Sequence, residues 1–212
     1  MELYWLGHAG FKIRTDEIVC YIDPFQIDEQ EHATYVFITH PHQDHLDLEA
    51  LDQIVGPDTL VVCTPDARSK LAKLDCEEII TVRPGQRIER DGLIIETHPA
   101  YNKTKKFHPQ SEGWVGYRII FEEGSVYHMG DTDELDELAG IKADIILIPV
   151  SGTYVMNPDE AATMANQLTY ERIIPMHYGS IVGTEADAEA FERKTKRAII
   201  PTLGEDILTT DI

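Results

Sequence analysis

A chain of 212 residues with 42% hydrophobic side chains can bury one sizeable core, and we expect one globular domain over residues 1–212. The formal net charge of -20 opposes binding to nucleic acid or to an anionic membrane, so neither partner is expected. The sequence lacks a long apolar run, a leader-like N-terminus and a CxxC pair, which predicts a cytoplasmic protein without a membrane span, a disulfide framework or a thiolate zinc site.

The first part of the chain predicts a β-meander followed by alternating helices and strands. Apolar and β-branched runs between turn residues predict the strands, and Gly56 with Pro57 closes the first helix. The expected strands are 2–6, 11–14, 17–23, 34–39, 59–64 and 78–82, with helices at 48–55 and 66–75.

The second part of the chain repeats this outline, although no repeat is visible in the letters. The expected strands are 86–90, 93–98, 114–122, 125–130, 144–150, 172–178 and 197–202, and the expected helices are 158–168 and 184–196. Pro158 suits the first turn of its helix. Two β-rich halves flanked by helices indicate two sheets packed face to face with helices outside.

The stretch "ITHPHQDHLD" places four metal-binding side chains where an apolar strand ends and a helix begins near Asp47. His40 and His42 can project the same way at a spacing of two, while Asp44 and His45 can turn toward a neighbouring point. Imidazole and carboxylate ligands suit zinc, manganese or iron. The loop therefore predicts two adjacent metal positions.

Two further ligands are expected at strand ends. Asp131 follows the strand of "SVYHMG", and His177 follows the strand of "RIIPM". Either residue alone would be read as a loop aspartate or a half-buried histidine. Because strand ends converge on one rim, both become candidate ligands beside the first cluster.

These motifs carry a resemblance to a known family. "THPHQDH" matches the HxHxDH signature of the metallo-β-lactamase superfamily. "WLGHAGF", "YIDPF", the GDT of "HMGDTD" and "IPMHYG" look like successive motifs of the branch that contains ascorbate-6-phosphate lactonase and N-acyl phosphatidylethanolamine phospholipase D. The resemblance implies an α+β fold, a four-layer αββα sandwich, with a dinuclear metal site on one edge. It also implies His40 and His42 on the first metal, Asp44, His45 and His177 on the second, and Asp131 as the bridge.

The third ligand of the first metal departs from this pattern. The branch usually places a histidine just after the strand that corresponds to 93–98, where this chain has Asn102. His108 lies six residues further on, in a loop that can fold back, and is the favoured ligand. His98, at the strand's end, is the alternative ligand or else a hydrogen-bonded strand residue.

Other residues are expected around the metals rather than on them. Asp23 would orient a ligand, as the family motif favours, or would simply begin the turn before Pro24. His8 is a second-shell or substrate contact or an ordinary turn histidine, and the lysines near His108 form either a positive lip or a solvated run. The remaining residues expected at the site or at the substrate are Asn102, Lys105, Lys106 and Tyr178.

The chemistry implied is hydrolysis. Two divalent ions would generate a hydroxide at neutral pH and polarise the bond that it attacks. Zinc is the favoured metal and manganese is the alternative. Asp44 would orient the hydroxide or accept its proton, and His177 completes the predicted catalytic pair. We expect a metal-dependent hydrolase of a small anionic ester, either a sugar-phosphate lactone or a phosphodiester.

Two other functions use the same scaffold. An iron-dependent oxidoreductase would suit the ligand types, although His42 stands where the diiron members tend to place glutamate. A nuclease is opposed by the net charge. Association into homo-oligomers is left open by the sequence.

Overall fold

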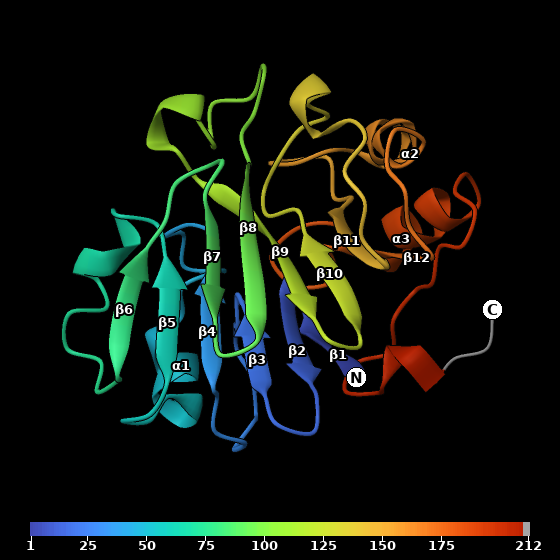
Figure 1. Cartoon of the computed structure of the whole chain (residues 1–212). Coiled ribbons are helices and arrows are strands. Elements are labelled where there is room, and N and C mark those ends of the chain that lie inside the picture. Colours follow the sequence, from blue (N-terminus) through green and yellow to red (C-terminus); the bar gives the residue numbers. More distant parts are fainter. Residues whose placement is uncertain (210–212) are drawn as a thin grey trace. The chain divides into compact units, whose positions relative to one another are not determined.

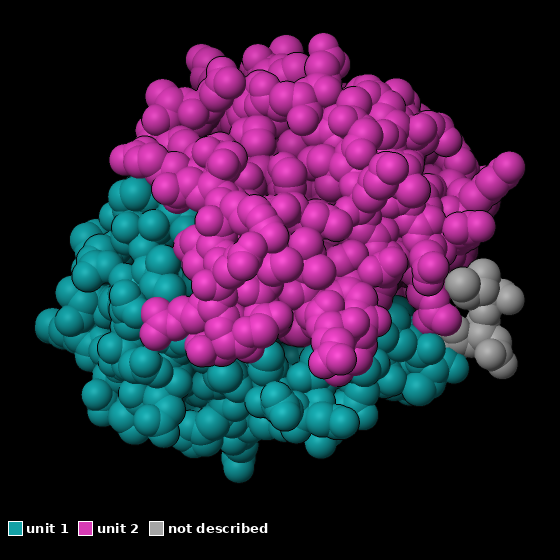
Figure 2. Space-filling view, in the orientation of Figure 1, with its two compact units in different colours: residues 1–82, 202–211 teal, residues 83–201, 212 magenta. Residues whose placement is uncertain are grey.

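The computed structural model describes residues 1–209 and divides the chain into two compact units (Figure 2). Unit 1 consists of Met1–Val82 and the segment from Thr202, and unit 2 consists of Arg83–Pro201. Each unit is built on a six-stranded mixed sheet (Figure 1). The single domain over 1–212 stays a prediction.

The sheet of unit 1 begins as an antiparallel meander and continues with parallel strands. Its order is β1 (Glu2–Gly7), β2 (Gly10–Arg14), β3 (Val19–Ile22), β4 (Tyr35–Ile38), β5 (Leu60–Cys63) and β6 (Glu78–Thr81). The pairs β1–β2 and β2–β3 are antiparallel, and the pairs from β3 to β6 are parallel. Strands β1, β3, β4 and β5 therefore end at the same edge, which brings together the loops that follow them.

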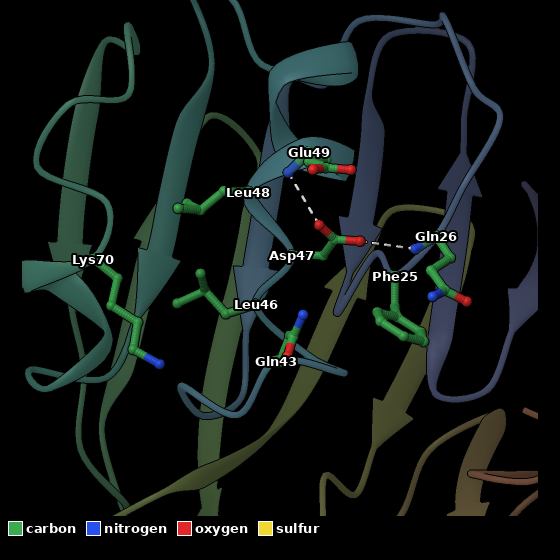
Figure 3. Close-up of a pocket in the computed structure, with 8 residues that line it drawn as sticks. All are labelled: Phe25, Gln26, Gln43, Leu46, Asp47, Leu48, Glu49 and Lys70. Atoms are coloured by element: carbon green, nitrogen blue, oxygen red, sulfur yellow. Dashed lines mark hydrogen bonds between the residues drawn. The ribbon is translucent and has the colours of Figure 1, made fainter. Parts of the chain in front are cut away.

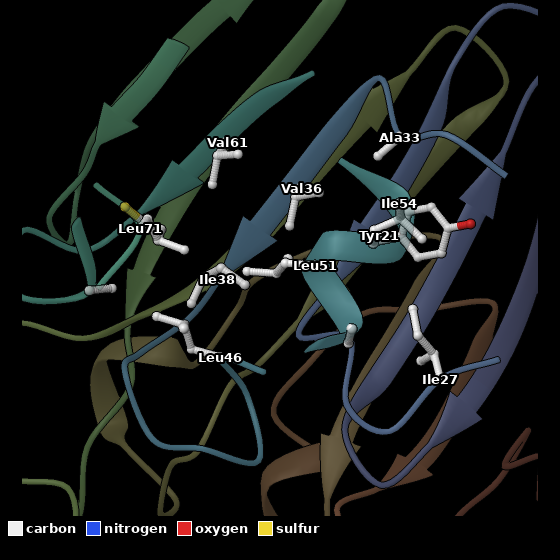
Figure 4. Packing of buried hydrophobic residues seen from close by; sticks show 13 residues of the cluster. Tyr21, Ile27, Ala33, Val36, Ile38, Leu46, Leu51, Ile54, Val61 and Leu71 are labelled. Carbon is white, nitrogen blue, oxygen red and sulfur yellow. The ribbon is translucent and has the colours of Figure 1, made fainter. Parts of the chain in front are cut away.

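Helix α1 (Leu48–Ile54) covers the parallel part of this sheet. The helix begins after Asp47, near the position that the sequence predicts, and Asp47 caps it by accepting hydrogen bonds from backbone N–H groups of the first turn. Apolar side chains of the helix pack on those of the strands and of the flanking loops (Figure 4). This core includes Tyr21, Val36, Ile38, Leu46, Ala50, Leu51, Ile54, Val61 and Leu71.

The sheet of unit 2 has the same plan with one more antiparallel strand. Its order is β12 (Arg172–Met176), β11 (Ile145–Pro149), β10 (Gly124–His128), β9 (Val115–Phe121), β8 (Leu93–Pro99) and β7 (Arg87–Arg90). The pairs among β7, β8, β9 and β10 are antiparallel, while β10–β11 and β11–β12 are parallel. Strands β8, β10, β11 and β12 consequently end at one edge.

Two helices complete unit 2. Helix α2 (Pro158–Ala165) has proline at its first position, as expected, and begins with a capping box on Asn157. Helix α3 (Glu185–Glu192) has Thr184 as its N-cap and packs against α2 and β12. The short 3-10 turns are η1 (Ala67–Ser69) and η4 (Ile207–Thr209) in unit 1, and η2 (Gln110–Glu112) and η3 (Asp136–Leu138) in unit 2.

Two expected elements are wrong. The helix expected over 66–75 is only the turn η1, although Ala67, Leu71 and Leu74 pack on the core; a helix this short does not offset the cost of its own nucleation. The strand expected over 197–202 forms only an isolated bridge at Ala198. Arg197 has φ +61°, which no strand residue adopts, and Pro201 has no N–H to pair.

Residues 1–209 contain no helix with the length and apolar character to cross a bilayer. In the same range the three cysteines are free thiols. Burial raises the pKa of Cys63 to about 12, so this thiol is inert at neutral pH.

Candidate metal centre

The loop of residues 39–47, which we call the ligand loop, connects β4 to α1 in unit 1. His40 Nε2 lies 3.0 Å from His42 Nδ1. Two ligand atoms of a tetrahedral zinc ion are separated by about 3.3 Å when each is about 2.0 Å from the metal. The other ring nitrogen of His40 lies 3.0 Å from Thr39 Oγ1. The two imidazoles thus face each other at a distance suited to one shared ion.

Three further ligand-type atoms lie close together, two from the ligand loop and one from the turn after β1. Asp44 Oδ2 lies 3.7 Å from His45 Nε2 and 3.1 Å from Nε2 of His8, which comes from the turn after β1. One ligand atom from each of these three residues lies within 4.8 Å of the others. His45 and His8 are buried, whereas the Asp44 side chain is 17% exposed. Asp44 is therefore the member of this group that solvent can reach.

Asp23, which follows β3, lies directly behind His45. This fully buried carboxylate accepts hydrogen bonds from Thr39 N at 2.8 Å and Thr39 Oγ1 at 2.6 Å, and Oδ2 is 2.7 Å from His45 Nδ1. A carboxylate only accepts, so Nδ1 of His45 carries the ring proton and Nε2 faces Asp44 with its lone pair. Asp23 has the geometry expected of a residue that orients a ligand.

Unit 2 carries a second cluster, centred on Asp131 in the loop after β10. Its Oδ2 atom lies 3.1 Å from His108 Nε2 and 3.0 Å from His177 Nε2. His177 follows β12, and its Nδ1 is 3.0 Å from Oγ of Ser151, which follows β11. All three members of the cluster are buried. The sheet edge thus brings a carboxylate and two imidazoles together, as expected for Asp131 and His177.

The two histidines considered for the remaining ligand position, His98 and His108, lie in different surroundings. The structure brings His108 to Asp131, whereas His98 packs edge-on against the ring of Tyr127 with 5.2 Å between centroids. Burial lowers the pKa of His98 and keeps it neutral. Asn102 is also buried, and its Oδ1 lies 3.1 Å from His108 Nδ1. Asn102 therefore contacts the histidine beside the carboxylate rather than taking the position of a ligand.

Three candidate residues have a left-handed backbone. His8, Asp23 and His177 have φ values of 51°, 46° and 62°, a region that costs energy for residues other than glycine. Such conformations gather at functional sites, where the surrounding structure holds them. The structure around these three residues therefore holds each of them in a costly backbone conformation.

The remaining predicted residues have mixed positions. Lys105 Nζ is 2.6 Å from Asp133 Oδ1, so its charge is paired within the protein, while Lys106 is exposed. Tyr178 is buried next to His177 in the chain, and burial raises the pKa of its hydroxyl. Neither Lys105 nor Tyr178 is presented as an exposed contact for substrate.

A pocket of about 600 Å³ borders the ligand loop on unit 1 (Figure 3). Gln43, between the ligand candidates His42 and Asp44 in the chain, lines it, and Lys70 is its single cation. Lys70 Nζ also donates to the carbonyl oxygen of Pro41 in the ligand loop. The other lining residues are Phe25, Gln26, Leu46, Asp47, Leu48 and Glu49.

The sequence did not point to Thr39, Ser151 or Asp133. Thr39 directly precedes His40, and Ser151 follows a strand that ends at the same edge as β12. Hydroxyl and carboxylate side chains at strand ends near histidines were the available signal for them. Thr39 contacts Nδ1 of His40, Ser151 contacts Nδ1 of His177, and Asp133 accepts from the amide of Asn102, so none of the three takes a ligand position.

Comparison with known proteins shows which family the chain belongs to. The family model for the beta-lactamase superfamily domain matches residues 2–177. The chain belongs to the β-lactamase superfamily. A relative from Methanopyrus kandleri, named UPF0173 metal-dependent hydrolase, is 30% identical over 212 residues, which cover 92% of each chain.

Solved structures of the superfamily share the fold. A protein of Parabacteroides distasonis, described as a candidate metal-dependent hydrolase, is 26% identical with a TM-score of 0.83 over 95% of this chain and 92% of that one. A metallo-β-lactamase fold protein of Bacillus subtilis is 13% identical with a TM-score of 0.73 over 96% and 98%. The α+β class and the metallo-β-lactamase fold expected from the sequence are thereby confirmed.

Proposed function

We propose that this chain is a metal-dependent hydrolase that holds two divalent ions. Zinc is the favoured metal and manganese is the alternative. The assignment follows the ligand pattern of the superfamily, and the name of the Methanopyrus kandleri relative supports it. The first ion would be held by His40, His42 and His108, the second by Asp44, His45 and His177, and Asp131 would be shared.

One observation carries the proposal. Four candidate histidines each have Nδ1 held by an outer partner, while Nε2 faces another ligand-type atom. Metal-bound histidines show this arrangement, because the outer hydrogen bond fixes the tautomer and the ring orientation. The pairs are His40 with Thr39, His45 with Asp23, His108 with Asn102 and His177 with Ser151. Nitrogen and carboxylate donors of this kind fit zinc or manganese.

The bound ions would supply a nucleophile from water near neutral pH and polarise the bond that is cleaved. Asp44 is the partly exposed carboxylate of its cluster and would accept the proton of the attacking water. His8, at 3.1 Å, would hold Asp44 in place for that role. Asp131 would keep His108 and His177 in fixed positions.

The substrate would be a small anionic ester, a sugar-phosphate lactone or a phosphodiester. A net charge of -20 repels anions over most of the surface, so local cations must attract the substrate. Lys70 in the pocket and the exposed Lys106 could do so. The same net charge supports a small-molecule substrate rather than nucleic acid or a membrane surface.

The proposal is tested by counting metals. Protein purified without chelators is analysed for zinc, manganese and iron, together with His42→Ala, His177→Ala and the exposed loop variant His32→Ala. We expect about two zinc or manganese ions per chain, as in a two-metal site. Each ligand variant should lose metal, and His32→Ala should retain it.

Activity is then measured on a sugar-phosphate lactone and on bis(4-nitrophenyl) phosphate. Cleavage of either substrate by the wild type and its loss in His42→Ala supports the hydrolase. Iron as the bound metal, or metal-loaded protein that cleaves neither substrate and matches His42→Ala in every assay, contradicts it.

A further inference from the structure

The loop that carries His108 is closed on itself by Asn102. The backbone N–H of Asn102 donates to the carbonyl oxygen of His108 at 2.7 Å, and the backbone N–H of His108 donates to Asn102 Oδ1 at 3.1 Å. Both side chains are buried. The two residues, six positions apart, therefore hold each other in a fixed relation although they lie in an irregular loop.

Four partners determine the orientation of the Asn102 amide. Its Nδ2 donates to Asp133 Oδ1 at 3.1 Å and to the carbonyl oxygen of Tyr154 at 2.8 Å. Its Oδ1 faces the backbone N–H and the Nδ1 atom of His108. A flipped amide would place its oxygen against two acceptors and its NH₂ group against an N–H donor, so only the observed orientation satisfies all partners.

This orientation determines the tautomer of His108. The amide oxygen can only accept, so a hydrogen bond at 3.1 Å requires the ring proton on Nδ1. In the neutral ring the lone pair then belongs to Nε2, the atom 3.1 Å from Asp131 Oδ2. Asn102 thus directs the nitrogen that can bind a metal toward the carboxylate.

Asp133 is itself held by one cation and by a backbone N–H group. Its Oδ1 is 2.6 Å from Lys105 Nζ, and its Oδ2 accepts from the backbone N–H of Lys103 at 2.9 Å. Asp133 lies two residues beyond Asp131, in the same loop after β10. The ion pair with Lys105 therefore ties the loop of His108 to the loop of Asp131.

We propose that Asn102, braced by Asp133 and Lys105, is a positioning residue that fixes His108 as its Nδ1–H tautomer and sets the metal affinity of that histidine. The inference rests on the proposed function in taking His108 as a ligand. It gives Asn102, which stands where the family's branch usually has a histidine, the role of orienting His108. It gives Lys105, which the sequence suggested as a substrate contact, the role of holding Asp133.

The first test uses the metal-free chain. Nitrogen-15 NMR of the histidine rings reports which nitrogen of His108 carries the proton, with His108→Ala assigning the signal. We expect a proton on Nδ1 in the wild type, alone or together with one on Nε2, and a proton on Nε2 alone in Asn102→Leu, which keeps the size of the side chain without its hydrogen bonds. An Nε2–H form in the wild type, or an unchanged tautomer in Asn102→Leu, overturns the inference.

The second test titrates Co²⁺ against a competing chelator and records the visible spectrum of the cobalt protein. Loss of an outer-shell partner typically costs about 10–100-fold in metal affinity, and we expect this loss at one site of Asn102→Leu. Lys105→Met should weaken cobalt binding in the same direction, whereas Lys106→Met, at an exposed position of the same loop, should bind cobalt as the wild type does. Equal effects of the two lysine variants would indicate loop charge alone and overturn the network.

The two proposals fail in different ways. If His108→Ala binds cobalt as tightly as the wild type, the ligand assignment of the proposed function is wrong, whatever the tautomer. If His108→Ala loses cobalt but Asn102→Leu does not, only the positioning role is wrong. Should Asn102→Leu fail to fold, Asn102→Asp and Lys105→Met test the same network, since Asn102→Asp sets two carboxylates against each other at Asp133 and should also weaken cobalt binding.

Discussion

Replacing Asp23 by asparagine tests whether the hydrogen bond behind His45 determines metal binding. Asparagine has nearly the same shape and tolerates the left-handed φ of 46°, so the backbone should stay in place. Its single acceptor oxygen can still bind Thr39 N. Its NH₂ group would then face His45 Nδ1, which must become an acceptor, so the ring proton moves to the Nε2 atom that faces Asp44.

The expected loss of affinity follows from that change. Loss of an outer-shell partner typically weakens metal binding about 10–100-fold, which corresponds to about 1.4–2.7 kcal/mol. We expect a loss of this size at one of the two proposed sites of Asp23→Asn, measured by competition of Zn²⁺ with a chelator. Asp28→Asn is the matched control, because Asp28 lies in the same unit with an exposed side chain.

A clear result would refute the reasoning. If Asp23→Asn folds, as judged by urea unfolding of the metal-free protein, and binds zinc as tightly as the wild type, the outer hydrogen bond does not control His45. If Asp28→Asn weakens binding as much as Asp23→Asn, the effect comes from net charge and not from the contact at 2.7 Å.

Three further predictions concern stability. Burial lowers the pKa of His98 below its ordinary 6.5, so its stabilising contribution is complete above pH 6.5 and declines as the pH falls toward the folded pKa. Between about pH 7.5 and about pH 5, the free energy of urea unfolding should therefore fall less for His98→Gln than for the wild type. Leu51→Ala should cost about 2–5 kcal/mol in urea unfolding, while Leu48→Ala, at a position 47% exposed, should cost far less. Gly116→Ala should lower the thermal midpoint, because a Cβ atom there would lie 2.7 Å from two backbone carbonyl oxygens, and an unchanged midpoint would contradict the packing.

The ligand candidates could be predicted from the sequence because their signals are local. His40 and its neighbours stand directly after an apolar run, and Asp131 and His177 stand after two others. Strands that run in the same direction end at one edge of their sheet. The position of each strand end is therefore enough to predict which candidate side chains lie at the same edge within one unit. No longer-range knowledge was needed for these residues.

The wrong elements show where local pattern fails. Ala67, Leu71 and Leu74 stand at the three- and four-residue spacing of a helix and pack on the core, yet the segment forms only the turn η1. Residues 197–202 have strand-like composition, but Arg197 turns the chain into the left-handed region before a ladder can form. In both segments tertiary packing overrode a preference that the sequence reports correctly.

The role of Asn102 could not be read from spacing, because it depends on groups far away in the chain. The sequence presents Asn102 as a missing ligand and His108 as one of two replacements. The structure adds the position of Asp133 and of the Tyr154 carbonyl, which orient the amide of Asn102 and, through it, the ring of His108. Asparagine is a poor zinc ligand, but at the proposed site Asn102 determines which ring nitrogen of His108 is available to bind the metal.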